Sequence, residues 1–108
     1  DRNEMSSAPP EEDLPQRFAR LAREWKDECA HSSSLKERVE HRAYQNIIEM
    51  GGAAVSLILL DLQRGADHWG PALRAITGEN PVLAADAGRL DRIRIAWLAW
   101  GRTRELLS

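Results

Sequence analysis

The chain has 108 residues, of which 43% are hydrophobic and 30% are charged, and these values are typical of one globular domain. No apolar run approaches the ~20 residues that a membrane-spanning helix requires, so no membrane contact is expected. The formal net charge of −2 excludes the uniformly basic surface of a protein that coats nucleic acid. A single cysteine, Cys29, cannot form an intramolecular disulfide, so a reducing, cytoplasmic setting is expected.

Residues 1–15 differ in composition from the rest of the chain. They hold three of the five prolines, and five acidic residues stand against one arginine. A segment of this kind has too few apolar side chains to offset the entropy of ordering. The sequence therefore predicts a disordered, acidic tail at residues 1–15 and one helical domain at residues 16–108.

In the domain, apolar residues recur at spacings of three and four, which is typical of helices. The first helix is expected over residues 16–29. A second is expected to run without a break from Ser34 to Met50, because Ser34 and Glu37 have the spacing of a capping box and two glycines follow the helix.

Residues 53–64 form the most apolar stretch, with large aliphatic side chains around most of the helix circumference. A helix of this kind is expected at the centre of a fold. After a turn in which Asp67 or a neighbour caps, a fourth helix is expected to hold Pro71 in its first turn and to end at Gly78. Together these segments predict an all-α domain of about five helices with a helical hairpin at its centre.

The last helix is expected from residue 85 or 86 onward, with an apolar stripe that includes two tryptophans. The chain has four tryptophans in all. Trp25 and Trp97 lie on apolar stripes and are predicted to be core residues, whereas Trp69 and Trp100 lie near helix ends and could equally face a partner.

Catalytic and metal-binding patterns are weak. Glu37 and His41 could share an ion, but two ligands are too few, and solvated ion pairs with the flanking Arg38 and Arg42 are favoured. Cys29 completes the apolar stripe of the first helix, so a packed thiol is favoured over a nucleophile. Asp67 and His68 are adjacent and diverge, so an enzyme that uses His68 or His41 is disfavoured. The sequence predicts no enzyme, no metal and no cofactor.

Nucleic-acid binding is a stronger competitor, because residues 89–108 carry five arginines against two acidic residues. Neither a helix-turn-helix pattern nor stacking aromatics accompany them. The arginines are Arg89, Arg92, Arg94, Arg102 and Arg104.

Three motifs follow one another in the chain: His41-x-x-Tyr44-x-x-Ile47-Ile48-x-Met50-Gly51, His68-Trp69-x-x-Ala72-Leu73-Arg74-x-Ile76-Thr77-Gly78-x-x-Pro81-Val82 and Ala96-Trp97-Leu98-x-Trp100-Gly101. In this order they resemble a group of small, functionally uncharacterised bacterial proteins with a recurrent helical pattern. The segment from Gly51 to Arg74 also resembles a HEAT-type helix pair. The resemblance implies no catalytic motif, and HEAT-like pairs imply protein binding through a helical surface.

The sequence therefore predicts a non-enzymatic module that binds a second protein, as the neutralising, antitoxin-like member or the scaffold of a bacterial two-protein system. The predicted partner-binding residues are His68, Trp69, Arg74 and Trp100. A second copy of the chain is also a candidate partner, since surplus aromatic surface on a small domain is often covered in a symmetric dimer. The alternative is a nucleic-acid-associated regulator that acts through the arginines of the last helix.

Overall fold

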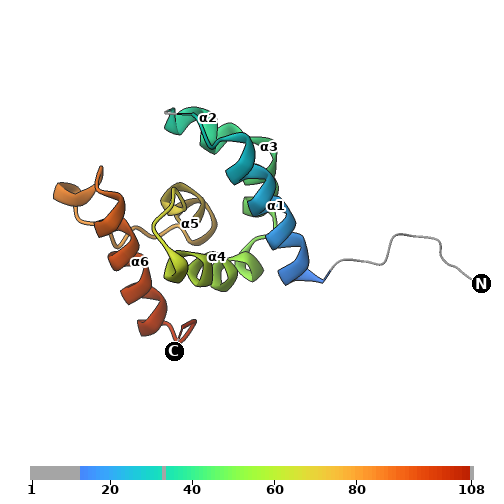
Figure 1. Cartoon of the computed structure of the whole chain (residues 1–108). Coiled ribbons are helices and arrows are strands. Elements are labelled where there is room, and N and C mark those ends of the chain that lie inside the picture. The colour runs from blue at the N-terminus through green and yellow to red at the C-terminus, as the bar shows by residue number, and fades with distance from the viewer. Residues whose placement is uncertain (1–12, 33, 108) are drawn as a thin grey trace, which may run out of the picture.

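The computed structural model describes residues 13–32 and 34–107, and within these ranges it contains helices and no strands. The predicted all-α class is confirmed. None of the described helices combines the length and the apolar character that crossing a membrane demands. The elements in chain order are α1 (Leu14–Glu28), α2 (Leu35–Glu40), α3 (Arg42–Glu49), α4 (Gly52–Arg64), α5 (Gly70–Thr77), the short 3-10 helix η1 (Ala84–Asp86) and α6 (Leu90–Thr103) (Figure 1).

Helix α1 begins at Leu14, so the predicted tail at residues 1–15 is wrong for its last two residues, and Asp13 before them caps the helix. The side chain of Asp13 accepts a hydrogen bond from the Gln16 backbone N–H at 2.9 Å, and the Gln16 side chain accepts one from the Asp13 N–H at 3.4 Å. This capping box starts the helix within the acidic segment. Residues 1–12 of the predicted tail lie outside the described residues.

The helix predicted from Ser34 to Met50 is interrupted at His41, which has an extended backbone with φ −59° and ψ 137°. The His41 ring explains the break. Its Nδ1 accepts a hydrogen bond from the Ala43 backbone N–H at 3.0 Å and so caps α3, while its Nε2 lies 2.6 Å from a carboxylate oxygen of Glu28 on α1. A contact with another helix thus replaces one turn of helix.

The backbone carbonyls that the break leaves without helical donors find side-chain donors instead. The Trp25 indole donates to the Arg38 carbonyl at 2.9 Å, and the Gln45 amide donates to the Val39 carbonyl at 2.6 Å. The break therefore leaves neither of these two carbonyls without a hydrogen-bond donor.

The ends of the next helices agree more closely with the predictions. Helix α4 occupies the expected segment, and Gly78 ends α5 in the left-handed conformation with φ 75°. The expected cap by Asp67 or a neighbour is wrong, since the Asp67 side chain accepts from the adjacent His68 N–H and the N-cap residue, Trp69, makes no side-chain cap. The hydroxyl of Tyr44 on α3 caps α5 in its place, by accepting the Ala72 N–H at 2.9 Å.

The last helix begins at Leu90, later than the expected residue 85 or 86. Residues 84–86 form η1, and the chain then turns so that Arg89 takes an extended conformation before α6. Glycine at position 88 favours this interruption over a continued helix.

Helix α5 lies in the middle of the molecule, in contact with α3, α4 and α6, while α1 runs beside α3 (Figure 1). Helix α4 was predicted to be central, and it packs against α1, α5 and α6. One side of α4 nevertheless faces solvent, since Leu60 is 49% exposed.

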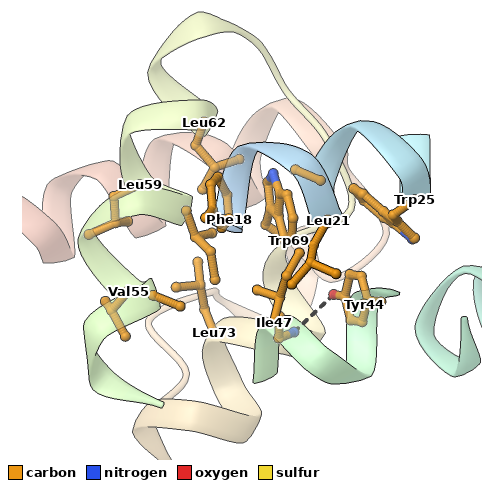
Figure 2. Packing of buried hydrophobic residues seen from close by; sticks show 14 of the residues in the cluster. Phe18, Leu21, Trp25, Tyr44, Ile47, Val55, Leu59, Leu62, Trp69 and Leu73 are labelled. Carbon is orange, nitrogen blue, oxygen red and sulfur yellow. Dashed lines mark hydrogen bonds between the residues drawn. The ribbon is translucent and has the colours of Figure 1, made fainter. Parts of the chain in front are cut away.

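The centre of the core is an aromatic cluster around Trp69 (Figure 2). The Trp69 ring lies 4.6 Å from Trp25, 5.6 Å from Phe18 and 5.7 Å from Tyr44, measured between ring centroids. Its indole N–H donates to Asp61 at 2.8 Å, and the same carboxylate oxygen lies 2.6 Å from the Lys26 ammonium. The cluster joins α1, α3 and α4 to the start of α5.

Candidate functional site

A pocket of about 260 Å³ lies between the start of α5, the loop that carries η1, and α6. We call it the α5–α6 pocket. Most of its lining is apolar or small. The lining residues are Leu35, His68, Gly70, Pro71, Arg74, Asn80, Val82, Ala84, Ala87, Gly88, Leu90, Ile93 and Trp97.

The pocket exists because small residues meet there from three segments. Gly70 begins α5, Ala84 lies in η1, and Ala87 and Gly88 lead into α6. A Cβ atom on residue 70 would lie 3.4 Å from the side chain of Ile93, so even one methyl group there would occupy part of the space. Larger side chains at these positions would fill the pocket.

The loop that closes the pocket is held by hydrogen bonds near the end of α5. The Glu79 N–H donates to the Thr77 hydroxyl at 3.1 Å, and the Val82 N–H donates to the Asn80 side chain at 3.2 Å. The Thr77 hydroxyl itself donates to the Leu73 carbonyl at 2.7 Å. These local bonds fix the direction in which the loop leaves the helix.

One polar group in the pocket wall has no hydrogen-bond partner within residues 13–32 and 34–107. Trp97 is fully buried, and its indole Nε1 finds no hydrogen-bond acceptor among the described residues. The atom lies 4.0 Å from the position that a Cβ on Gly70 would take, and Gly70 lines the pocket as well. An unsatisfied buried donor costs about 1–3 kcal/mol, which an acceptor supplied from the pocket would recover.

The charge at the pocket comes from Arg74. Burial lowers the pKa of His68, and Arg38 lowers it further, while Asp67 opposes both. His68 is therefore neutral at pH 7, and Arg74 is the one fully charged residue among the described lining residues. The Arg74 side chain is exposed and forms no ion pair with the described residues.

The structure separates the four predicted partner-binding residues. His68 and Arg74 line the pocket, as described above. Trp100 is half-buried, with its ring 5.2 Å from Trp97, and its indole donates to Glu79 at 3.3 Å. Trp69 is fully buried in the aromatic cluster, so its prediction as a contact residue is wrong. Its place near a helix end concealed that α5 starts in the centre of the fold.

The predicted core assignments of Trp25, Trp97 and Cys29 are confirmed, because all three side chains are buried. Burial raises the pKa of the Cys29 thiol, which disfavours the reactive thiolate. His41 uses both ring nitrogens in contacts within the protein, to Ala43 and to Glu28. The disfavoured candidate pair of Glu37 and His41 is not formed, since the Glu37 carboxylate accepts from Ser32 at 2.7 Å.

The five C-terminal arginines do not form one free surface. Arg94 donates to the carbonyls of Leu62 and Gln63, at 2.5 Å and 2.9 Å, and so ties α6 to the end of α4. Arg104 contacts Glu79 at 2.6 Å and lies over the Trp100 ring at 5.1 Å. Arg104 is exposed nonetheless, as are Arg89, Arg92 and Arg102, which make neither kind of contact with the described residues. Two of the five thus serve the fold.

Among the described residues, no group of three or more metal-ligating side chains lies close enough together to hold an ion. Comparison of the chain with models of protein families, with curated proteins and with solved structures found no match.

Sequence reasoning found two lining residues of the pocket and missed the rest. The missed ones are small or aliphatic and come from the loop after α5 and the start of α6. The available signal was the three alanines and one glycine among residues 84–88, whose small side chains leave space wherever they face another helix.

Proposed function

We propose that the protein is a non-enzymatic module that binds a second protein at the rim of the α5–α6 pocket. The observation that supports this proposal is an exposed apolar rim beside an apolar pocket. Leu83 lies between two lining residues and is 70% exposed, and Leu35, which lines the pocket, is 50% exposed. Single exposed leucines are common, but leucines beside an apolar pocket are typical of contact sites.

The charge at the rim favours a partner with acidic groups near its apolar contact. Arg74 is exposed at the pocket and lacks an ion pair among the described residues, so it is available to a carboxylate. Arginine is enriched at protein interfaces because its guanidinium pairs with planar carboxylates. The proposed surface therefore consists of Leu35, His68, Arg74 and Leu83, with Trp100 adjacent to it.

We test this proposal by affinity capture of partners from extract of the source cells, using the wild type and the Leu83→Asp variant. Leu83 caps η1 with an extended backbone, a position that favours aspartate, so the variant is expected to fold. The capture of a specific partner is expected to fall at least about tenfold, because loss of an anchoring side chain at the centre of an interface has this effect.

Leu60→Asp is the matched control, since Leu60 is also an exposed leucine but lies on α4, beside the groove between α1 and α4. Its capture of the partner is expected to equal that of the wild type. Loss of capture with Leu60→Asp, and not with Leu83→Asp, would move the contact to α1 and α4 and refute the proposed surface.

Two further arms separate the other predicted partners. Treatment with nuclease, together with Arg102→Glu, tests the nucleic-acid alternative, because phosphate contacts are lost with either change. Light scattering of the purified chain tests a symmetric dimer. One stoichiometric partner that resists nuclease would support an antitoxin-like role in a bacterial two-protein system, whereas several partners would support a scaffold.

A further inference from the structure

The unpaired indole of Trp97 distinguishes the interior of the α5–α6 pocket from an ordinary packing defect. The other three tryptophans each donate from the indole, Trp25 to Arg38, Trp69 to Asp61 and Trp100 to Glu79. Only Trp97 has no acceptor among the described residues, although it is fully buried. Buried donors are nearly always satisfied, by protein groups, by ordered water or by a bound molecule. Because the Trp97 Nε1 is closed to solvent in this structure, an acceptor from a bound molecule reaches it through a small local opening of the pocket wall.

The position of Arg74 indicates the charge of that molecule. The Trp97 Nε1 lies beside Gly70. Arg74 follows Gly70 by four residues, so Gly70 and Arg74 lie on one face of α5, about 6 Å apart along the helix axis. Helical side chains tilt toward the N-terminus, which directs the stem of Arg74 back toward residue 70. None of the described residues that line the pocket is acidic.

The volume limits the size of the molecule. A dry cavity of about 150 Å³ admits a benzene ring, and the α5–α6 pocket measures about 260 Å³. We propose that the pocket binds a small apolar carboxylic acid, with an oxygen that accepts a hydrogen bond from Trp97 Nε1 and a negative charge that faces Arg74. This site lies inside the rim proposed above, and the inference holds whether or not a partner protein binds there.

The probe is 3-phenylpropanoate, which combines one aromatic ring with a carboxylate on a short chain. It is titrated into the full chain labelled with nitrogen-15, and the four indole N–H signals are followed by NMR. The Trp97 signal, assigned from the Trp97→Phe variant, is expected to move downfield as its hydrogen bond forms. The other three signals are expected to stay in place, and no movement of the Trp97 signal would overturn the proposal.

Two related compounds test the ligand class. The neutral 3-phenylpropanamide keeps an acceptor oxygen and loses the charge, so its affinity is expected to be about two- to fivefold lower, as for an exposed ion pair. The alcohol 3-phenylpropan-1-ol loses the charge and is a poorer acceptor, so it is expected to bind more weakly still. Equal affinity for all three compounds would overturn the assignment of a carboxylate.

The blocking variant is Gly70→Ala, and its matched control is Gly52→Ala. Both glycines are the first residue of a helix. An added methyl group would meet only ordinary contacts at position 70 and none at position 52, so both variants are expected to fold. Binding of 3-phenylpropanoate is expected to fall at least tenfold in Gly70→Ala and to stay unchanged in Gly52→Ala. Equal binding by the two variants would place the ligand elsewhere.

A second pair of variants tests the charge contact without changing the packing of the pocket. Arg74 and Arg102 are both exposed on helices, and only Arg74 lines the pocket. Arg74→Gln is expected to lower the affinity for 3-phenylpropanoate by about two- to fivefold and to leave the affinity for 3-phenylpropanamide unchanged. Arg102→Gln is expected to change neither affinity. An equal effect of both variants would mean that only general charge attraction is involved.

Discussion

Removal of one hydroxyl group, in Tyr44→Phe, tests how the centre of the fold is held together. The Tyr44 hydroxyl donates to the His68 carbonyl at 2.7 Å and accepts from the buried Ala72 N–H at 2.9 Å. The N-cap residue of α5, Trp69, supplies no side-chain cap, so this hydroxyl is the cap of the helix. Burial raises the pKa of Tyr44 well above its ordinary value, and the hydroxyl remains a donor at neutral pH.

The expected loss of stability follows from the two hydrogen bonds of the Tyr44 hydroxyl. The bond to the His68 carbonyl contributes about 1 kcal/mol, and the Ala72 N–H left without an acceptor costs about 1–3 kcal/mol. The free energy of unfolding should therefore fall by about 2–4 kcal/mol. The phenyl ring keeps its aromatic contacts, so no large cavity adds to this value.

Urea denaturation followed by tryptophan fluorescence measures the loss, and the midpoint is expected to fall with little change in slope. Thr103→Ala is the control, because it removes an exposed hydroxyl that donates to the Ala99 carbonyl. Its effect should stay within about 0.5 kcal/mol. A loss in Tyr44→Phe no larger than that of the control would refute the assignment of Tyr44 as the cap of α5.

Three further predictions concern packing, thiol chemistry and pH. In Gly101→Ala the added methyl group would lie 2.8 Å from Leu59, so overpacking should lower the free energy of unfolding by about 1–3 kcal/mol in urea titrations; an unchanged midpoint would contradict this close contact. Cys29 should react with a thiol reagent many times more slowly in the folded than in the urea-unfolded chain, because burial raises its pKa; equal rates would contradict that burial. Since the pKa of His68 is lowered in the fold, its contribution to stability is complete above about pH 6.5 and is lost as the pH falls toward its folded pKa. The stability lost between about pH 7.5 and pH 5.5 should therefore be smaller in His68→Gln, as measured by urea denaturation at both pH values; an equal loss would contradict the lowered pKa.

The helix ends that depend on neighbouring residues could be predicted from the sequence. Gly78 ends α5 because its left-handed conformation costs glycine little. Ser34 starts α2 because its hydroxyl accepts the Glu37 N–H at 3.2 Å. Both signals act within one turn of helix, so their residues lie close together in the sequence.

The features that depend on distant residues could not be predicted in this way. The break at His41 is stabilised by Glu28 from α1, and the Arg38 carbonyl before the break accepts from the Trp25 indole. The burial of Trp69 depends on Asp61, eight residues earlier, and on rings from two other helices. A spacing pattern within one helix contains no information about such contacts.

The candidate site falls between these two cases. The charged and polar residues His68 and Arg74 are conspicuous in the sequence, and both line the pocket. The volume of the pocket depends on which small side chains face one another across α5, η1 and α6. That arrangement follows from the packing of the whole domain, and the small residues that provide it carry no polar or charged side-chain group that would mark them in the sequence.

Hydrogen–deuterium exchange of the captured complex shows whether the partner binds at the rim of the α5–α6 pocket. The backbone amides of residues 79–93 are expected to exchange more slowly in the complex than in the free chain. Those on the solvent side of α4, around Leu60, are expected to exchange at the same rate in both. Slower exchange confined to α1 and α4, with residues 79–93 unchanged, would contradict binding at this rim.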